Sequence, residues 1–269
     1  MARKRITAVQ KWDEELAKYA VQAAAQEEST AIGSFFSLRG GQLSFADSPI
    51  PNNQMAVVII DSIIENVFYP GQYNPEEPQG PMCFAFGRLE KELIPHESVT
   101  EAQSDDCVTC PNNQWGSAQQ GRGKACRNTR RLALLPAGTL AANGALEEAY
   151  DLDHFKSAQV GFMKLPVTSV KGFANYVKTV SVTLKRPPFA IFTRISVVPD
   201  PKTQFRVIFE PLKEVPNTML QVLIGRHEEV KQMIDFPYQP AEELPESKTK
   251  VSRRKTAAKK KTASRKKRY

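Results

Sequence analysis

MAVVIIDSIIENVFY, residues 55–69, is the stretch of sequence that decides the fold. Its many β-branched residues disfavour a helix and predict one long or bent central strand. Around it, a tight hairpin is predicted where Gly40-Gly41 separates two alternating apolar runs. The predicted strands besides the central one cover 35–45, 82–88, 131–138, 189–199 and 204–212, the last two joined by DPKT (200–203).

Helical periodicity appears in three other stretches. The predicted helices cover 12–28, 165–184 and 219–236. In the second, Val170, Phe173, Val177, Val180 and Leu184 share one face. Residues 139–158 are predicted to form a loop or short helix. Several strands closed by a helix and interrupted by a polar insertion indicate a mainly β fold with helices (α+β), built as an OB-like barrel.

The charge of the chain is unevenly distributed. The 269 residues carry a net charge of +8, but residues 248–269 hold 12 of the 37 Lys and Arg and no acid. The remainder is net −4. The run KTKVSRRKTAAKKKTASRKKRY cannot bury a core, so a disordered basic tail that attracts polyanions is predicted. Without a long apolar run or an apolar segment near the N-terminus, neither a membrane span nor a secretory signal peptide is expected.

Four cysteines carry the strongest chemical signal. CVTCPNNQWGSAQQGRGKAC places Cys107 and Cys110 in a C-x2-C turn and Cys126 shortly after them. Three such thiolates need one more ligand to complete a tetrahedral Zn²⁺ site. His96 is the preferred fourth ligand because it lies in polar sequence beside the turn, and Cys83, in an apolar strand, is the alternative. An iron–sulfur cluster or four metal-free thiols are the other interpretations.

Basic residues surround this module. No acid occurs between Asp106 and Glu147, although the body of the chain is acidic. Lys and Arg contact phosphates, and exposed aromatic rings stack on bases, so this composition favours nucleic-acid binding. The predicted contact residues in and after the module are Trp115, Arg122, Lys124, Arg127, Arg130 and Arg131. A second predicted set, on the helix 165–184 and the following hairpin, is Lys171, Tyr176, Lys178 and Arg194.

The motifs IPHESV, CVTCPNNQWGS, GRGKAC and RRLALLP, followed by KLPVTSVKGFANYVKTV and FTRISVVPDPKTQFRVIFEP, resemble a known group of proteins. They are similar to zinc-module single-stranded DNA-binding proteins of tailed phages and prophages, among them the helix-destabilising replication proteins. The resemblance covers about residues 35–212. It implies an OB-type barrel with a zinc subdomain whose one His and three Cys ligands map onto His96, Cys107, Cys110 and Cys126.

These observations lead to one expected organisation and function. Residues 1–34 form a basic arm and helix, 35–238 an OB-like domain with a zinc module inserted at about 89–131, and 239–269 the tail. The expected function is sequence-tolerant binding of single-stranded DNA, or RNA, in phage replication or recombination, with one structural Zn²⁺ and phage replication or recombination proteins as partners. A cytoplasmic protein without enzymatic activity is expected. A duplex-packaging or nucleoid protein and a zinc-dependent nucleic-acid enzyme are the alternatives.

Overall fold

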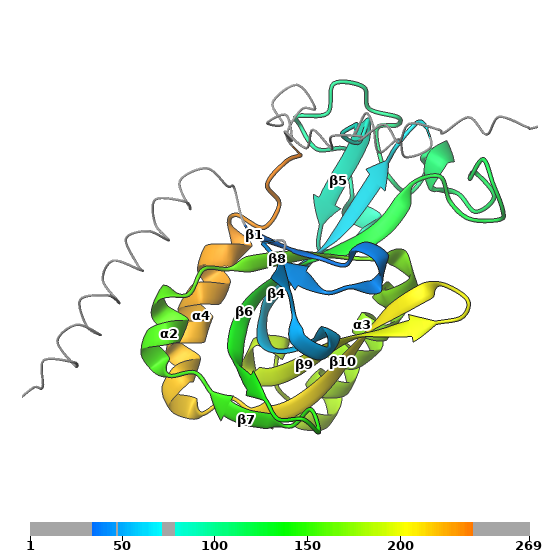
Figure 1. Cartoon of the computed structure of the whole chain (residues 1–269). Coiled ribbons are helices and arrows are strands. Elements are labelled where there is room, and N and C mark those ends of the chain that lie inside the picture. The colour runs from blue at the N-terminus through cyan, green and yellow to red at the C-terminus, as the bar shows by residue number, and fades with distance from the viewer. Residues whose placement is uncertain (1–33, 47, 72–78, 239–269) are drawn as a thin grey trace, which may run out of the picture.

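A large sheet with helices on both faces forms the body of the protein in the computed structural model (Figure 1). The structure describes residues 34–46, 48–71 and 79–238, so the predicted N-terminal helix and basic tail lie outside the described residues. The strands are β1 (Ser34–Ser37), β2 (Ser44–Phe45), β3 (Ser48–Pro49), β4 (Gln54–Phe68), β5 (Cys83–Gly87), β6 (Arg127–Leu140), β7 (Leu146–Ala149), β8 (Gly161–Leu165), β9 (Ile191–Asp200) and β10 (Gln204–Glu214). The α-helices are α2 (Leu152–Ser157), α3 (Val167–Thr179) and α4 (Asn217–Lys231).

β4 organises the sheet, as the sequence predicted. The strand order is β10-β9-β4-β6-β8-β1-β2-β3, with β5 added beside β4 and β7 beside β6. The first half of β4 lies between β9 and β6, and its second half lies between β5 and β6. All of these ladders are antiparallel except the pairing of β1 with β8. One strand therefore spans two regions of the molecule, the helix-covered body and the extension that carries β5.

Both faces of the first half of β4 are buried, which explains its nearly continuous apolar sequence. Val57 and Ile59 pack in the core under α3, whereas Val58 and Ile60 pack in the core under α2 and α4. The ladder with β6 shifts register between Ile59 and Asp61. On the predicted helix, Phe173 and Val180 are buried in this core and Val170 and Val177 pack against it, so the predicted apolar face is confirmed except at Leu184, which is exposed.

The sheet is open in the described part of the chain, where no ladder joins β3 to β10. The mixed α+β class is thus confirmed, whereas barrel closure is not found. The turn Arg39–Gly41 packs against β9 and β10, and Gly41 adopts a φ of +78° close to the Phe205 ring. A side chain at that position would be strained by the left-handed backbone conformation. This contact brings the β1–β2 hairpin against the far end of the sheet without hydrogen-bonded closure.

The predicted element boundaries differ from the structure in three places. The predicted helix 165–184 is α3 followed by a π-helical turn at Val180–Leu184, and Leu165 ends β8. The stretch predicted as loop or short helix contains both β7 and α2. β6 begins at Arg127, so the irregular insertion ends earlier than predicted. Strands as short as β7 and β8 contain too few residues for an alternation of apolar and polar side chains to be recognised in the sequence.

Candidate nucleic-acid interface and cysteine cavity

The strands β5, β4 and β6 extend beyond the helices and carry the cysteine-rich loop (Figure 1). Side chains alternate between the two faces of this extension. Cys83 is paired with Phe68 and Arg127 with Val67, so Cys126, the residue immediately before β6, falls opposite Phe68. Cys83 and Cys126 therefore lie on the same face, on the two strands that flank β4. Arg127 lies on the opposite face.

All four cysteines line one small cavity on that face. Its volume is about 20 Å³, enough for one water or one ion. The C-x2-C turn is held by Asp106, whose carboxylate accepts hydrogen bonds from the Thr109 backbone N–H at 2.7 Å and from its hydroxyl at 2.6 Å. The three cysteines predicted as ligands are brought together, and Cys83 joins them.

The cavity is unfavourable for free thiolates. Burial raises the pKa of Cys107 to about 11 and that of Cys126 to about 12, and the neighbouring sulfur atoms raise both further. Burial likewise raises the pKa of Cys83. Without a cation these thiols stay protonated at neutral pH, and several thiolates could share the cavity only around a positive ion.

The four cysteine sulfur atoms at the cavity are of the kind that binds Zn²⁺. Within the described ranges, however, no three His, Cys, Asp or Glu side chains are already close enough together to hold a metal ion. The buried Nδ2 of Asn66 has no hydrogen-bond partner at normal distance. It nevertheless lies close enough to Cys107 to lower the pKa of that thiol by hydrogen bonding. A thiolate at Cys107 would satisfy this buried donor, and outer hydrogen bonds of this kind are typical of metal sites.

His96, the preferred fourth ligand from sequence, does not line the cavity. Its ring stacks on Phe84, with centroids 5.3 Å apart, and contacts Phe86 edge-on. Its Nδ1 lies 2.9 Å from the Ser98 hydroxyl and accepts from the Ser98 backbone N–H at 3.2 Å. The structure therefore favours the alternative, Cys83, because the pairing of β5 with β4 places this residue at the cavity.

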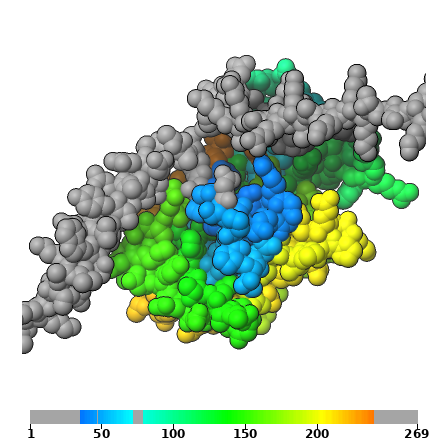
Figure 2. Space-filling model, viewed as in Figure 1, coloured from blue at the N-terminus to red at the C-terminus, as the bar shows by residue number. Residues whose placement is uncertain are grey.

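A groove of about 410 Å³ lies between the end of β4 and the loop that precedes β6. It is lined by Phe68, Tyr69, Pro70, Gly71, Ala118, Gln119, Gln120, Lys124, Ala125 and Arg127, none of which is acidic. The loop projects from the body at the upper right of the space-filling view (Figure 2). Polar amides and two cations in an open groove are suited to a phosphate backbone.

Aromatic rings accompany both cations of the groove. The Lys124 ammonium lies 5.9 Å from the centre of the Trp115 ring, and the Arg127 guanidinium lies 5.6 Å from the Tyr69 ring. Trp115 is 80% exposed, so it contributes little to folding and is free to stack on a base. The sequence analysis did not select Tyr69, because it is the last residue of a predicted strand. Its contact with Arg127 arises only when β4 pairs with β6.

The groove is hydrogen-bonded to the wall of the cysteine cavity. Lys124 donates to the Asn113 side-chain oxygen at 3.2 Å, and Asn113 donates to the backbone oxygen of Cys107 at 2.5 Å. The Asn128 amide also donates to Asn113, at 2.9 Å, and to Asn66, at 2.6 Å. The buried amides therefore connect the position of Lys124 to the cysteine turn.

Two predicted contact residues are corrected by their burial. Arg131 is 2% exposed and forms an ion pair with Glu65 at 3.0 Å, and Tyr176 is 5% exposed and hydrogen-bonded to Thr193. Neither can reach a bound strand in this conformation. Arg131 failed as a prediction because the segment that contains Ile234 and Phe236 packs over its face of β6, and Tyr176 because it is on the core face of α3.

The other predicted contacts lie in separate places. Arg122 is exposed near the groove, and Arg130 is half-buried on the same face as the cysteines. Lys171 and Lys178 are exposed on α3, far along the chain from the groove loop. Arg194 is held by Glu210 at 2.8 Å. The structure thus brings Trp115, Lys124 and Arg127 together, whereas no residue of the second predicted set is among the described residues that line the groove.

Comparisons with family models, with curated proteins and with solved structures gave no match for this chain. Among the described residues, no helix has the length and apolar character needed to cross a membrane. The geometry of the groove and of the cysteine cavity therefore carries the functional argument.

Proposed function

We propose that this chain binds single-stranded nucleic acid in a sequence-tolerant manner through the groove between Tyr69 and Trp115. The observation that carries the proposal is the pairing of each groove cation with a ring, Lys124 with the exposed Trp115 and Arg127 with the half-buried Tyr69. Cations along a groove follow the phosphates, and rings stack on bases of any sequence, because every base has a π face.

We propose that Zn²⁺ supports one wall of this groove, held by Cys83, Cys107, Cys110 and Cys126. When bound, the ion would cross-link β5, the C-x2-C turn and the start of β6. Cys126 lies between Lys124 and Arg127 in the chain, so fixing its sulfur also restrains the backbone of both cations. The role is structural, because the proposed ligand set leaves no open coordination position.

The remaining parts of the proposal rest on the sequence. We infer that the curved sheet is an incompletely closed OB-like barrel. We propose a non-enzymatic role in phage DNA replication or recombination, on the resemblance of the motifs between 35 and 212, and action in the cytoplasm, where thiols remain reduced. The basic tail at 248–269 would add affinity for any polyanion.

The test is a pair of titrations with a labelled oligothymidylate and a duplex of the same length. Trp115→Ala should weaken single-strand binding by about 1–3 kcal/mol, as loss of one stacked base does. Tyr150→Leu, a half-exposed tyrosine that stacks on His154 away from the groove, is the control. Equal affinity of the parent protein for both nucleic acids, unaffected by Trp115→Ala, would overturn the proposal and favour a duplex-packaging protein.

A further inference from the structure

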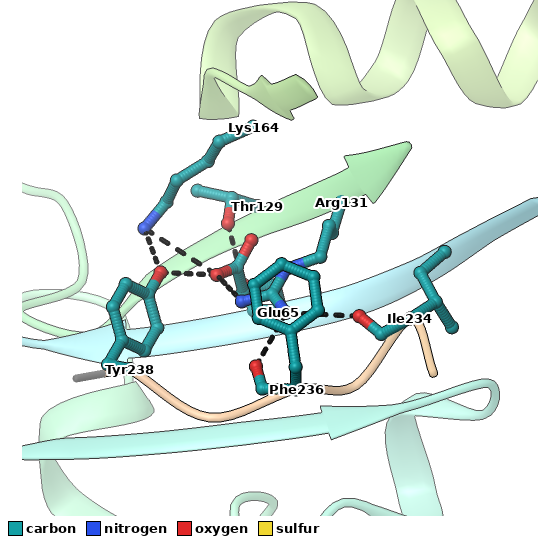
Figure 3. A network of polar contacts seen from close by, with 7 residues as sticks. All are labelled: Glu65, Thr129, Arg131, Lys164, Ile234, Phe236 and Tyr238. Atoms are coloured by element: carbon teal, nitrogen blue, oxygen red, sulfur yellow. Dashed lines mark hydrogen bonds and ion pairs between the residues drawn. The ribbon is translucent and has the colours of Figure 1, made fainter. Parts of the chain in front are cut away.

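A third cation–aromatic pair lies beside the groove. The Lys164 ammonium is 5.0 Å from the centre of the Tyr238 ring and donates to its hydroxyl at 2.6 Å (Figure 3). The Lys164 side chain is 34% exposed, and Tyr238 is half-buried. This pair therefore repeats the pattern of Lys124 with Trp115 and Arg127 with Tyr69.

Strand register places this pair on the groove face of the sheet. Lys164 on β8 is paired with Arg131 on β6, and Arg127 lies four residues before Arg131 on the same face. Arg127 and Arg131 are therefore about 13 Å apart along β6, a distance that roughly four nucleotides of a stacked single strand would span. Burial lowers the pKa of Lys164, and the positive charges of Arg131 and Arg127 lower it further. The negative charge of Glu65 acts in the opposite direction and raises it.

The charge balance of the site leaves it positive. Glu65 is 1% exposed, and its carboxylate contacts Arg131, Lys164 and the Tyr238 hydroxyl (Figure 3). Glu65 is shared by two cations, Arg131 at 3.0 Å and Lys164 at 3.8 Å, so the three charges together leave a net positive charge beside the surface. Burial raises the pKa of Tyr238, which keeps the phenol neutral and harmless to a phosphate.

The Tyr238 ring is held in place from below. It packs edge-on against Phe84, 5.1 Å between centroids, and stacks on Phe86 at 6.3 Å. The segment leading to it is fixed by Arg131, which donates to the backbone oxygens of Ile234 at 3.0 Å and of Phe236 at 2.7 Å. A ring supported in this way loses little entropy when a base stacks on it.

We propose that Tyr238 and Lys164 form a third subsite, over which a single strand continues after leaving the groove. The inference rests on the proposed function and extends it from two stacking positions to three. Tyr238 supplies a ring face for a base, and Lys164 supplies a phosphate contact. Together with Tyr69 and Trp115, the subsite defines a path across β4, β6 and β8.

The first experiment is photocross-linking of the full-length protein to an oligothymidylate that contains 5-iodouracil, followed by mass spectrometry of the peptides. It requires no substitution and therefore separates contact from a purely structural role. A cross-link at Tyr238, in addition to cross-links at Trp115 or Tyr69, is expected. Cross-links at Trp115 or Tyr69 without one at Tyr238 would overturn the subsite and leave the groove intact.

The second experiment measures binding by four variants whose melting temperatures are also determined. Tyr238→Leu should weaken binding about 5- to 150-fold with little change in salt dependence, whereas Tyr238→Phe, which keeps the ring, should bind like the parent. Lys164→Gln should lower the slope of log affinity against log salt by about 0.7, one phosphate contact, whereas Lys164→Arg should retain it.

The controls separate failure of the subsite from failure of the function. Tyr150→Leu and Lys178→Gln, a tyrosine and a lysine away from the path, should bind like the parent. If Trp115→Ala weakens binding while Tyr238→Leu and Lys164→Gln do not, the subsite is wrong and the groove stands. If none of these variants weakens binding, the proposed function itself fails.

Discussion

Neutralising the two groove cations together gives the sharpest test of the nucleic-acid interface. The variant is Lys124→Gln with Arg127→Gln. Arg127 is exposed, and its recorded ring contact is with Tyr69, so its loss should scarcely affect folding. Lys124 gives up one hydrogen bond to Asn113, which keeps its bond from Asn128, so we expect a stability loss of at most about 1 kcal/mol.

The expected effect on binding follows from counterion release. Each lost phosphate contact lowers the slope of log affinity against log salt by about 0.7 on a single strand, so two contacts lower it by about 1.4. Between 50 and 200 mM salt, the deficit of the variant relative to the parent should therefore shrink by about sevenfold. The variant should be weakest, compared with the parent, at low salt.

The assay is fluorescence anisotropy of a labelled oligothymidylate, titrated at several salt concentrations with full-length protein. Lys171→Gln with Lys178→Gln is the matched control, because it removes the same charge from the exposed side of α3. Parallel salt slopes for the parent and the groove variant would refute the reasoning. A reduced slope in the α3 control instead would move the binding surface to that helix.

Four further predictions follow from the same structure. Cys83→Ser should lower the zinc content measured by atomic emission, whereas His96→Ala should leave it unchanged; the reverse result would restore the histidine ligand. Arg131→Leu should cost about 3–5 kcal/mol in urea unfolding, because it leaves the Glu65 carboxylate buried without its partner, and a loss below about 1 kcal/mol would contradict this. Burial raises the pKa of Tyr176 to about 12, whereas tyrosine in the unfolded chain titrates near pH 10. The contribution of Tyr176 to the free energy of unfolding should therefore be intact below about pH 10 and decline as the pH rises towards 12. Tyr176→Phe should flatten this decline in unfolding curves measured at alkaline pH. Removing residues 248–269 should weaken binding to single strands, duplex DNA and heparin alike while keeping or sharpening the single-strand preference, and loss of that preference would assign binding to the tail.

Local sequence predicts the strands of this fold better than their arrangement. β4, β5 and the β9–β10 hairpin lie where alternation and β-branched residues predicted them. Barrel closure could not be predicted, because it depends on whether the edges β3 and β10 meet, which involves residues far apart in the chain. Local periodicity contains no information about that contact.

The differences between prediction and structure at the candidate site have the same origin. His96 was preferred to Cys83 on the polarity of its neighbours, whereas the pairing of Cys83 with Phe68 across two strands is what places Cys83 at the cavity. Alternation along the run RNTRR places Arg127 and Arg131 on one face and Arg130 on the other, but Arg131 is buried because Ile234 and Phe236 pack over it. A period of two separates only Arg130 from the other two arginines, whereas the burial of Arg131 depends on a segment that lies 103 residues later in the chain.

The extension formed by β5, β4 and β6 explains why one short segment could serve both proposed sites. On one face, Asn66, Phe68 and Cys83 line the cysteine cavity. On the other, Tyr69 and Arg127 begin the proposed path that leads to Lys164. Because β4 alternates between these faces at successive residues, any shift that moves Phe68 at the cavity also moves Tyr69 at the groove. A metal on one face would therefore fix the stacking surface on the other, and chelation should weaken strand binding without removing any contact residue.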